Sequence, residues 1–279
     1  MNTTLAIALL ASLLVLCSNS GSAHYLREKC GHIREDFSAS VGPWTALLHE
    51  NGTIFCAGTL ITDAFILTAA SCIRENDVYV RLGEYGRYAT EIAEDHKVQM
   101  SLRNRLFNRE SLANNIGLLK LTKRVQLKEY IMPICIILDP QQQQQPSHSQ
   151  FIGNAWTLDS EEYLTKEFGP IAIQRKPERC PNLDLYTQFC AGHSGNSESC
   201  DGLMGSPLIQ NYRYLHKNRH VQFGIATESD MDCQATQAYT DVLRLYWWIQ
   251  DVLSLFDNRL YDYKPKQSYV VGDNVKTIV

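Results

Sequence analysis

Residues 65–72 read Phe-Ile-Leu-Thr-Ala-Ala-Ser-Cys, a short apolar run that ends in a serine and a cysteine. Similar runs recur along the chain, separated by glycine, asparagine and aspartate. They lie at residues 44–48, 53–61, 64–70, 78–82, 116–121, 151–158 and 221–227. Their lengths, and the turn residues between them, are typical of β-strands. Only residues 241–256 space apolar side chains three and four positions apart, which predicts one helix closing an all-β chain.

The two ends of the chain differ in composition from its middle. Residues 1–23 carry no charged side chain and are almost wholly apolar over 5–16, which is typical of a cleaved secretory signal peptide. This apolar run is shorter than the roughly 20 residues of a membrane-spanning helix. We therefore expect a secreted, extracellular protein without a membrane partner. Residues 24–40 form an N-terminal segment, and residues 257–279 form a C-terminal tail without clear periodicity.

Residues 139–150 interrupt the apolar pattern near the middle of the chain. They contain five consecutive glutamines between two prolines and have no apolar side chain to bury, which predicts a solvated linker between two β halves. Hydrophobic residues make up 44% of the whole sequence, which supports a sizeable core and excludes disorder throughout. The formal net charge is −4 and no lysine or arginine cluster stands out, so nucleic acid is not an expected partner.

The cysteines predict disulfide bonds. The sequence has nine, and eight remain once Cys17 leaves with the signal peptide. Eight cysteines in an oxidising compartment are consistent with four disulfides, although the sequence alone leaves the pairing open and buried free thiols are the alternative. Asn51-Gly52-Thr53 is an N-glycosylation sequon among turn-forming residues, which makes Asn51 a candidate glycan acceptor. The histidines are dispersed and match no metal-binding motif, so we expect no metal and no cofactor.

Three segments resemble the catalytic motifs of the chymotrypsin and trypsin family of serine proteases. Residues 65–72 resemble the segment Leu-Thr-Ala-Ala-His-Cys, with Ser71 in the place of the catalytic histidine. Residues 114–121 resemble the strand that presents the catalytic aspartate, with Asn115 in its place. Residues 200–208 resemble the nucleophile loop Cys-x-Gly-Asp-Ser-Gly-Gly-Pro-Leu, with Met204 where the serine belongs. Further matches lie at residues 56–61, 132–135, 223–225, 233 and 239–249.

The resemblance implies a trypsin-like domain over residues 41–256, built from two six-stranded antiparallel barrels with a C-terminal helix. It also implies a disulfide map for the eight cysteines. The implied pairs are Cys30 with Cys135, Cys56 with Cys72, Cys180 with Cys190, and Cys200 with Cys233.

The three substituted positions bear on catalysis. The family's reaction needs a hydroxyl nucleophile, an imidazole to accept its proton and a carboxylate to orient the imidazole. Met204 has a thioether, which has no proton to lose and forms no acyl-enzyme. Ser71 has no group that titrates near neutral pH, and Asn115 carries no charge. We therefore expect no functional catalytic residue and no meaningful turnover.

The resemblance also bears on zymogen activation. Family members free an amine by cleavage before an Ile-Val-Gly-Gly-like sequence, and this amine pairs with the aspartate before the nucleophile. Residues 31–36 contain neither a basic residue ahead of Ile33 nor paired glycines, and Leu203 stands at the aspartate position, where it cannot accept a buried ammonium. Gly202 still occupies a position of the oxyanion hole, the pair of N–H groups that stabilises the reacting oxygen.

The positions of the specificity pocket give two interpretations. Glu198 falls where the family has its pocket floor, and an acid there would hold a lysine or arginine side chain. Ser229 and Gln237 replace wall glycines, and their side chains would narrow or plug the cavity. The alternative is that Glu198 is a solvated loop residue.

Three functions are compatible with these residues. The favoured one is a non-catalytic serine protease homologue that acts as a protein-binding or regulatory module, with a protease, zymogen or inhibitor as its extracellular protein partner. The rival is an active trypsin-like serine endopeptidase, which requires other residues to supply the catalytic groups. A structural role is the third, because fold alone does not fix function.

Overall fold

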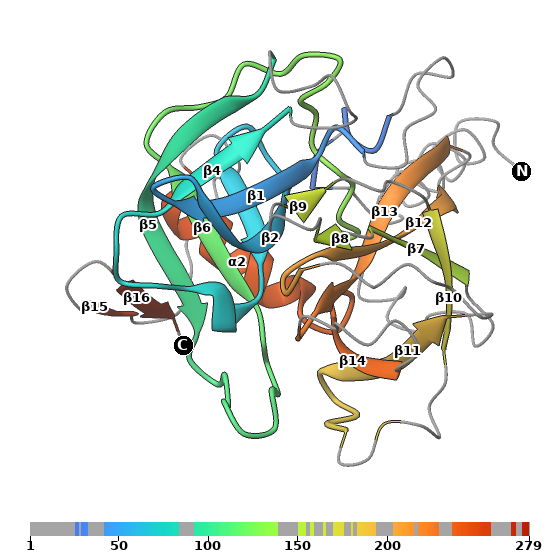
Figure 1. Cartoon of the computed structure of the whole chain (residues 1–279). Coiled ribbons are helices and arrows are strands. Elements are labelled where there is room, and N and C mark those ends of the chain that lie inside the picture. Colours follow the sequence, from blue (N-terminus) through green and yellow to red (C-terminus); the bar gives the residue numbers. More distant parts are fainter. Residues whose placement is uncertain are drawn as a thin grey trace, which may run out of the picture.

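Two β-barrels and a C-terminal helix make up most of the described part of this computed structural model (Figure 1). The first barrel is blue to green in Figure 1, and the second is mainly yellow to orange. The described residues are 26–27, 29–32, 42–83, 92–138, 150–154, 157–158, 164–165, 170–175, 180, 183–193, 203–214, 217–228, 236–257, 269–271 and 275–278.

The first barrel is a ring of six antiparallel strands in the order β4-β1-β2-β3-β6-β5. The strands are β1 (Thr45–Glu50), β2 (Thr53–Leu60), β3 (Phe65–Thr68), β4 (Tyr79–Leu82), β5 (Glu94–Asn104) and β6 (Gly117–Leu121). The ring closes because the long strand β5 pairs with β4 through its first half and with β6 through its second half. Apolar side chains from these strands fill its centre, including Phe65, Ile66 and Leu118, none of which reaches solvent.

The second barrel is closed in the order β10-β11-β14-β13-β12-β7, again with antiparallel pairs. Its strands are β7 (Gln150–Asn154), β10 (Pro170–Arg175), β11 (Gln188–His193), β12 (Pro207–Tyr214), β13 (Lys217–Ala226) and β14 (Thr236–Asp241). Phe151, Phe189, Phe223 and Tyr239 pack in its core, with neighbouring ring centres 5.6–6.0 Å apart. The prediction of two six-stranded antiparallel barrels is therefore confirmed.

The apolar run at residues 151–158 is not one strand. It divides between β7 and β8 (Thr157–Leu158), and β8 forms a separate two-stranded sheet with β9 (Leu164–Thr165). β7 also begins at Gln150, so the last position of the predicted 139–150 linker belongs to the second barrel. The rest of that linker lies outside the described residues.

The helix prediction was right in type and wrong at its start. Helix α2 covers Tyr246–Phe256, five residues later than the predicted start at residue 241. Asp241 instead ends β14, and its side chain accepts a hydrogen bond from the backbone N–H of Arg244 (3.1 Å), which stabilises a turn before the helix. The buried face of α2, which includes Trp248 and Val252, packs on the core of the first barrel.

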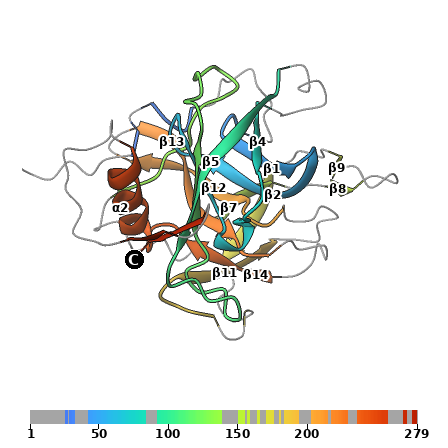
Figure 2. The same ribbon diagram turned by 90° about the vertical axis from the view of Figure 1, so that its left-hand side faces the viewer.

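The C-terminal tail extends the sheet of the first barrel (Figure 2). Strand β15 (Tyr269–Val271) pairs with β16 (Val275–Ile278), and β16 pairs in parallel with the end of β5. Among the described residues, no helix has both the length and the apolar character needed to cross a membrane.

A charged cluster joins the N-terminal segment to the end of α2. Arg124 binds Asp63 (2.6 Å) and Asp257, and Arg27 binds Asp63 (3.0 Å). Burial alone lowers the pKa of Arg124, but the hydrogen bonds and charges of Asp257 and Asp63 raise it overall. The Asp257 side chain is fully buried, so its pairing with Arg124 is needed to offset the cost of removing its charge from water.

Three disulfides occur among the described residues, and all three are pairs that the resemblance implied. Cys30–Cys135 attaches the N-terminal segment, Cys56–Cys72 ties β2 to the short 3₁₀ helix η1 (Ala70–Cys72), and Cys180–Cys190 reaches into β11. The fourth expected pair, Cys200 with Cys233, lies outside the described residues.

Candidate functional site

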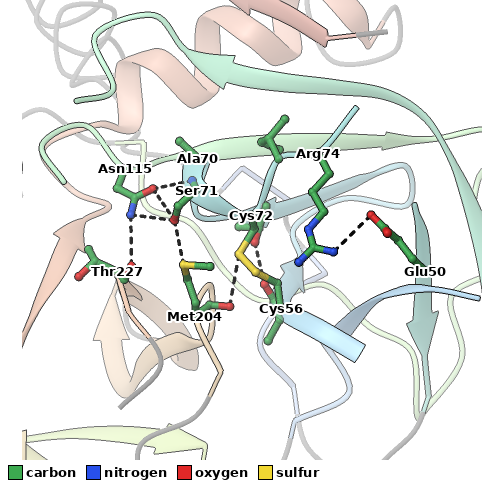
Figure 3. The surroundings of a disulfide bond; sticks show 12 residues. Glu50, Cys56, Ala70, Ser71, Cys72, Arg74, Asn115, Met204 and Thr227 are labelled. Carbon is green, nitrogen blue, oxygen red and sulfur yellow. Dashed lines mark hydrogen bonds and ion pairs between the residues drawn. A yellow bond between two sulfur atoms is a disulfide. The ribbon is translucent and has the colours of Figure 1, made fainter. Parts of the chain in front are cut away.

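The side chains of Ser71, Asn115 and Met204 meet where the two barrels touch (Figure 3). Ser71 lies on η1 directly after β3, and Asn115 lies two residues before β6. Met204 comes from the loop before β12 in the second barrel. The structure thus brings together three positions that are far apart in the sequence.

The buried amide of Asn115 is oriented by Ser71. The backbone N–H of Ser71 donates to Asn115 Oδ1 (2.9 Å), which fixes which end of the amide is the oxygen. Asn115 Nδ2 then donates to Ser71 Oγ (3.1 Å) and lies 3.5 Å from the carbonyl oxygen of Thr227. Because Asn115 is completely buried, these bonds replace those that its amide would make with water.

The hydroxyl proton of Ser71 has two acceptors within reach. Asn115 Oδ1 lies 3.2 Å from Ser71 Oγ, and Met204 Sδ lies 3.0 Å from it on the other side. A hydroxyl donates one proton, so only one of these contacts is a hydrogen bond at a given moment. The three side chains contain an alcohol, an amide and a thioether, and none of them is charged.

The backbone of the Met204 loop is anchored independently of the methionine side chain. The carbonyl oxygen of Met204 accepts a hydrogen bond from the N–H of Ala57 in β2 (2.9 Å). Cys72 Sγ also lies 3.5 Å from this oxygen, as drawn in Figure 3, but it belongs to a disulfide and has no proton to donate. The site is therefore fixed to the first barrel by a backbone hydrogen bond.

Gly205 permits this close approach of the two barrels. Its φ is +88°, and a Cβ atom there would lie 2.1 Å from the carbonyl oxygen of Ala57 and 2.6 Å from the hydroxyl of Thr68. Any other residue would push the loop away from β2, so glycine is required at this position.

Two threonines and one arginine support the site, and the sequence motifs assigned them no role. Thr240 Oγ1 donates to the backbone carbonyl of Asn115 (3.0 Å), and Thr227 supplies the carbonyl that faces the Asn115 amide. From β5, Arg103 donates to the carbonyls of Ala70 (3.3 Å) and Ile73 (2.9 Å) and so braces η1. Burial, followed by the nearby charge of Arg109, lowers the pKa of Arg103.

Only some of the other predicted site residues lie in the described part of the chain. Leu203 is partly exposed, and its carbonyl accepts the N–H of Ser206 (2.9 Å) in the turn around Met204. The backbone of Gln237 lies in β14 opposite Ala191, but its side chain is outside the described part. Gly202, Glu198 and Ser229 also lie outside it, as do residues 33–36 of the segment compared with the activation sequence.

Asn51 lies in the turn between β1 and β2. It has a φ of 50° and Gly52 a φ of 88°, which is typical of a tight two-residue hairpin turn. Asn51, Gly52 and Thr53 are all exposed. The side chain of His49 accepts a hydrogen bond from the backbone N–H of Gly52 (3.2 Å).

Among the described residues, no group of His, Cys, Asp and Glu side chains has the arrangement of a metal site.

Comparison with protein families identifies the class of protein. The family model described as Trypsin matches residues 33–249, most of the chain and both barrels. The chain therefore belongs to the chymotrypsin/trypsin-like family of serine proteases.

Several curated proteins are similar to this chain. Kallikrein-4 of Homo sapiens is 30% identical over 77% of this chain and 84% of its own length. Serine protease grass of Drosophila melanogaster is 28% identical, covering 76% of this chain and 64% of its own length. Mannan-binding lectin serine protease 1 of Mus musculus is 24% identical, covering 60% of this chain and 27% of its own length. This chain thus spans less than two thirds of the Drosophila and mouse proteins.

The Asn115 amide leads to a prediction about stability. In Asn115→Asp, an oxygen replaces the Nδ2 donor that faces the Thr227 carbonyl. The new carboxylate is buried, and none of the groups bonded to it carries a positive charge. We expect the free energy of unfolding to fall by about 1–3 kcal/mol. Adding Ser71→His should recover part of this loss, because an imidazolium beside the new carboxylate pairs its charge. Chemical denaturation of the two single variants and the double variant measures the coupling.

The neighbouring Asn114→Asp variant provides a control with the same chemical change. Asn114 is only partly buried, and its Nδ2 donates to the Leu106 carbonyl at the surface (3.3 Å), so a much smaller effect is expected. Two outcomes would show that burial of the Asn115 amide does not determine the stability of this site. One is equal destabilisation by the two aspartates, and the other is strictly additive effects of the substitutions at positions 71 and 115.

Proposed function

We propose that this protein is a non-catalytic member of its family and acts by binding another protein. The observation that carries the proposal is the uncharged Ser71, Asn115 and Met204 cluster at the junction of the barrels. Peptide hydrolysis in this family requires a base next to a nucleophilic hydroxyl. Here an amide and a thioether flank the only hydroxyl of the cluster.

Three candidates in the described part of the chain do not replace the missing groups. Ser206 is the nearest serine after Met204 in the sequence, but it is only 4% exposed, and its backbone is bonded to Leu203 and Ala226. His220 lies elsewhere, with its Nδ1 3.2 Å from the carbonyl of Gly31, and burial lowers its pKa. His49 is likewise occupied, between the Gly52 N–H and Asp95 (3.2 Å). These contacts support a binding function over the rival, an active endopeptidase.

The proposed loss of catalysis is tested with the purified full chain. We expect no labelling by a fluorophosphonate serine probe and no cleavage of a broad peptide library, because Met204 stands at the position of the nucleophilic serine. An active family protease processed in parallel is the positive control. The endopeptidase would be favoured instead if the probe labels one serine, the chain cleaves peptides, and substitution of that serine abolishes the cleavage.

The binding role is supported by the retention of the family's framework around the altered cluster. Both barrels close, and the Met204 loop is bonded to β2 through the N–H of Ala57. A protein that keeps the shape of a protease domain can engage the proteins that proteases engage, so a protease, a zymogen or an inhibitor is the proposed partner. The proposed setting is an extracellular protease cascade.

Affinity capture from extracellular fluid tests this partner class. We expect the immobilised chain to retain a protease, zymogen or inhibitor, and the purified pair to form a complex again. Heat-unfolded chain on the same support is the control. Recovery of only those proteins that also bind the unfolded chain would contradict the proposal.

Secretion and glycosylation form part of the same proposal. The uncharged, apolar leader and the three disulfides support an oxidising compartment. Asn51 is accessible at the tip of a hairpin, where a glycan would not disturb the core.

Expression of the full chain in eukaryotic cells tests both points. We expect the protein in the medium, starting after residue 23, with a mass that falls on enzymatic removal of N-glycans. Asn51→Gln should remove this mass difference without preventing secretion. Retention in the cell with an intact leader, or a mass unaffected by the enzyme, would count against the respective part of the proposal.

A further inference from the structure

The turn between β1 and β2 contains the one Asn-Gly pair in the sequence, Asn51-Gly52. In such a pair the backbone nitrogen of the glycine can attack the side-chain carbonyl carbon of the asparagine and close a five-membered ring, because glycine has no side chain to hinder the approach. Both residues are exposed, and a Cβ atom placed on Gly52 would meet no atom of another part of the chain within 4 Å. The surroundings therefore leave room for the turn to rearrange.

A buried imidazole contacts the nitrogen that would make this attack. The backbone N–H of Gly52 donates to His49 Nδ1 (3.2 Å). An accepting Nδ1 carries no proton, so the proton of the neutral ring is on Nε2. The His49 side chain is only 6% exposed, its ring stacks on that of Tyr79 with the centres 5.8 Å apart, and Ile54 of β2 lies opposite His49. The imidazole is thus held with its basic nitrogen at Gly52.

A carboxylate lies on the other side of the same ring. Asp95 Oδ1 is 3.2 Å from His49 Nε2, and Arg81 Nε donates to the same oxygen (2.8 Å). The hydrogen bond from Arg81 has the largest effect on the pKa of Asp95, and together with the charges of Arg81 and His49 it outweighs burial and lowers this pKa. Asp95 is therefore ionised near neutral pH and can balance the charge of an imidazolium.

The folded barrel is what brings these groups together. His49 belongs to β1, Arg81 to β4 and Asp95 to β5, and these strands are neighbours in the sheet (Figure 1). A base that faces the Gly52 nitrogen and a carboxylate that faces the base form an arrangement suited to proton removal.

From this arrangement we infer that Asn51 is a self-modification site, at which His49 is the base for the conversion of asparagine to aspartate and isoaspartate. The Gly52 N–H proton passes to His49 Nδ1, and the Gly52 nitrogen forms a bond to Asn51 Cγ. The bond between Cγ and the side-chain amide nitrogen then breaks, and ammonia leaves with the proton that His49 returns. Water opens the resulting succinimide ring at either carbonyl, which gives aspartate or isoaspartate.

The conversion competes with glycosylation, because both use the side-chain amide of Asn51. The inference therefore concerns chains that carry no glycan at this position. Such chains gain a negative charge in the turn and permanently lose the glycan acceptor. The reaction does not involve the cluster of Ser71, Asn115 and Met204, so its failure would leave the proposed non-catalytic binding function untouched.

The Thr53→Ala full chain is the parent for the test. This change removes the sequon and keeps Asn51-Gly52, so every chain starts with an unglycosylated asparagine. Peptide mass spectrometry follows Asn51 at neutral pH, with isoaspartate separated by chromatography. We expect both products, because the succinimide opens on either side. Aspartate alone would indicate direct hydrolysis of the amide and contradict ring closure. Conversion in urea but none in the folded chain would also overturn the inference.

His49→Gln separates the base from its hydrogen bond. The glutamine oxygen can accept the Gly52 N–H, whereas an amide takes up no proton near neutral pH. Conversion of Asn51 should slow at least about tenfold in this variant, because the base is lost. Asp95→Asn should slow it by a smaller factor, because the carboxylate only stabilises the imidazolium. Unchanged or faster conversion in His49→Gln would show that the imidazole orders or protects the turn, and would overturn the inference.

The pH dependence of the parent chain alone gives a second readout. Its rate should rise with pH and level off once His49 is neutral, because only the neutral ring accepts the proton. In His49→Gln the rate should keep rising with the hydroxide concentration. The matched control is the same two chains in urea, where they should convert at equal rates because the barrel no longer holds Asp95 and Gly52 against His49. A parent rate that does not level off, or a difference that persists in urea, would contradict the role of His49.

Discussion

The site depends on one buried amide at the junction of two barrels. Asn115 contacts η1 through Ser71, faces the second barrel through the Thr227 carbonyl and accepts Thr240 on its backbone oxygen. A polar group so deeply enclosed is tolerated because each of its hydrogen-bonding positions meets a partner. The same enclosure explains why a neutral residue suits this position: Ser71 supplies no positive charge to balance a carboxylate.

The framework of the fold is separable from the chemistry of the three side chains. The Met204 loop is held by its carbonyl and by the backbone around Gly205, and these bonds do not depend on the side chain at position 204. The Met204 side chain packs on the edge of the first core, whereas the second core does not include any of the three residues. Substitutions that change the chemistry at the junction thus leave the architecture intact, which is consistent with the proposed binding role.

Sequence patterns predicted those elements whose apolar residues are continuous. β3 and β6 are short buried runs and were predicted, whereas the 11-residue strand β5 was missed because its first half, Glu-Asp-His-Lys, consists of charged and polar residues. β10, β11, β12 and β14 were also missed, since such short mixed strands are stabilised by pairing partners distant in sequence.

For the site, the motifs predicted positions 71, 115 and 204, and the structure brings these residues together. The roles of Thr227 and Thr240 were not predicted, because a carbonyl or hydroxyl that contacts Asn115 from another barrel leaves no local pattern. The approach of Asp95 to His49 likewise depends on the pairing of strands that are distant in the sequence.

The enclosed amide also couples the choice of residue at position 115 to the choice at position 71. Because Asn115 and Ser71 are bonded to each other, a change to the family's aspartate and histidine at these positions involves two coupled substitutions. An aspartate arriving first leaves a lone anion in the interior, and a histidine arriving first lacks the acid that would orient it. Each single substitution would thus be less compatible with this interior than the pair made together, although the strands of both barrels do not depend on either residue.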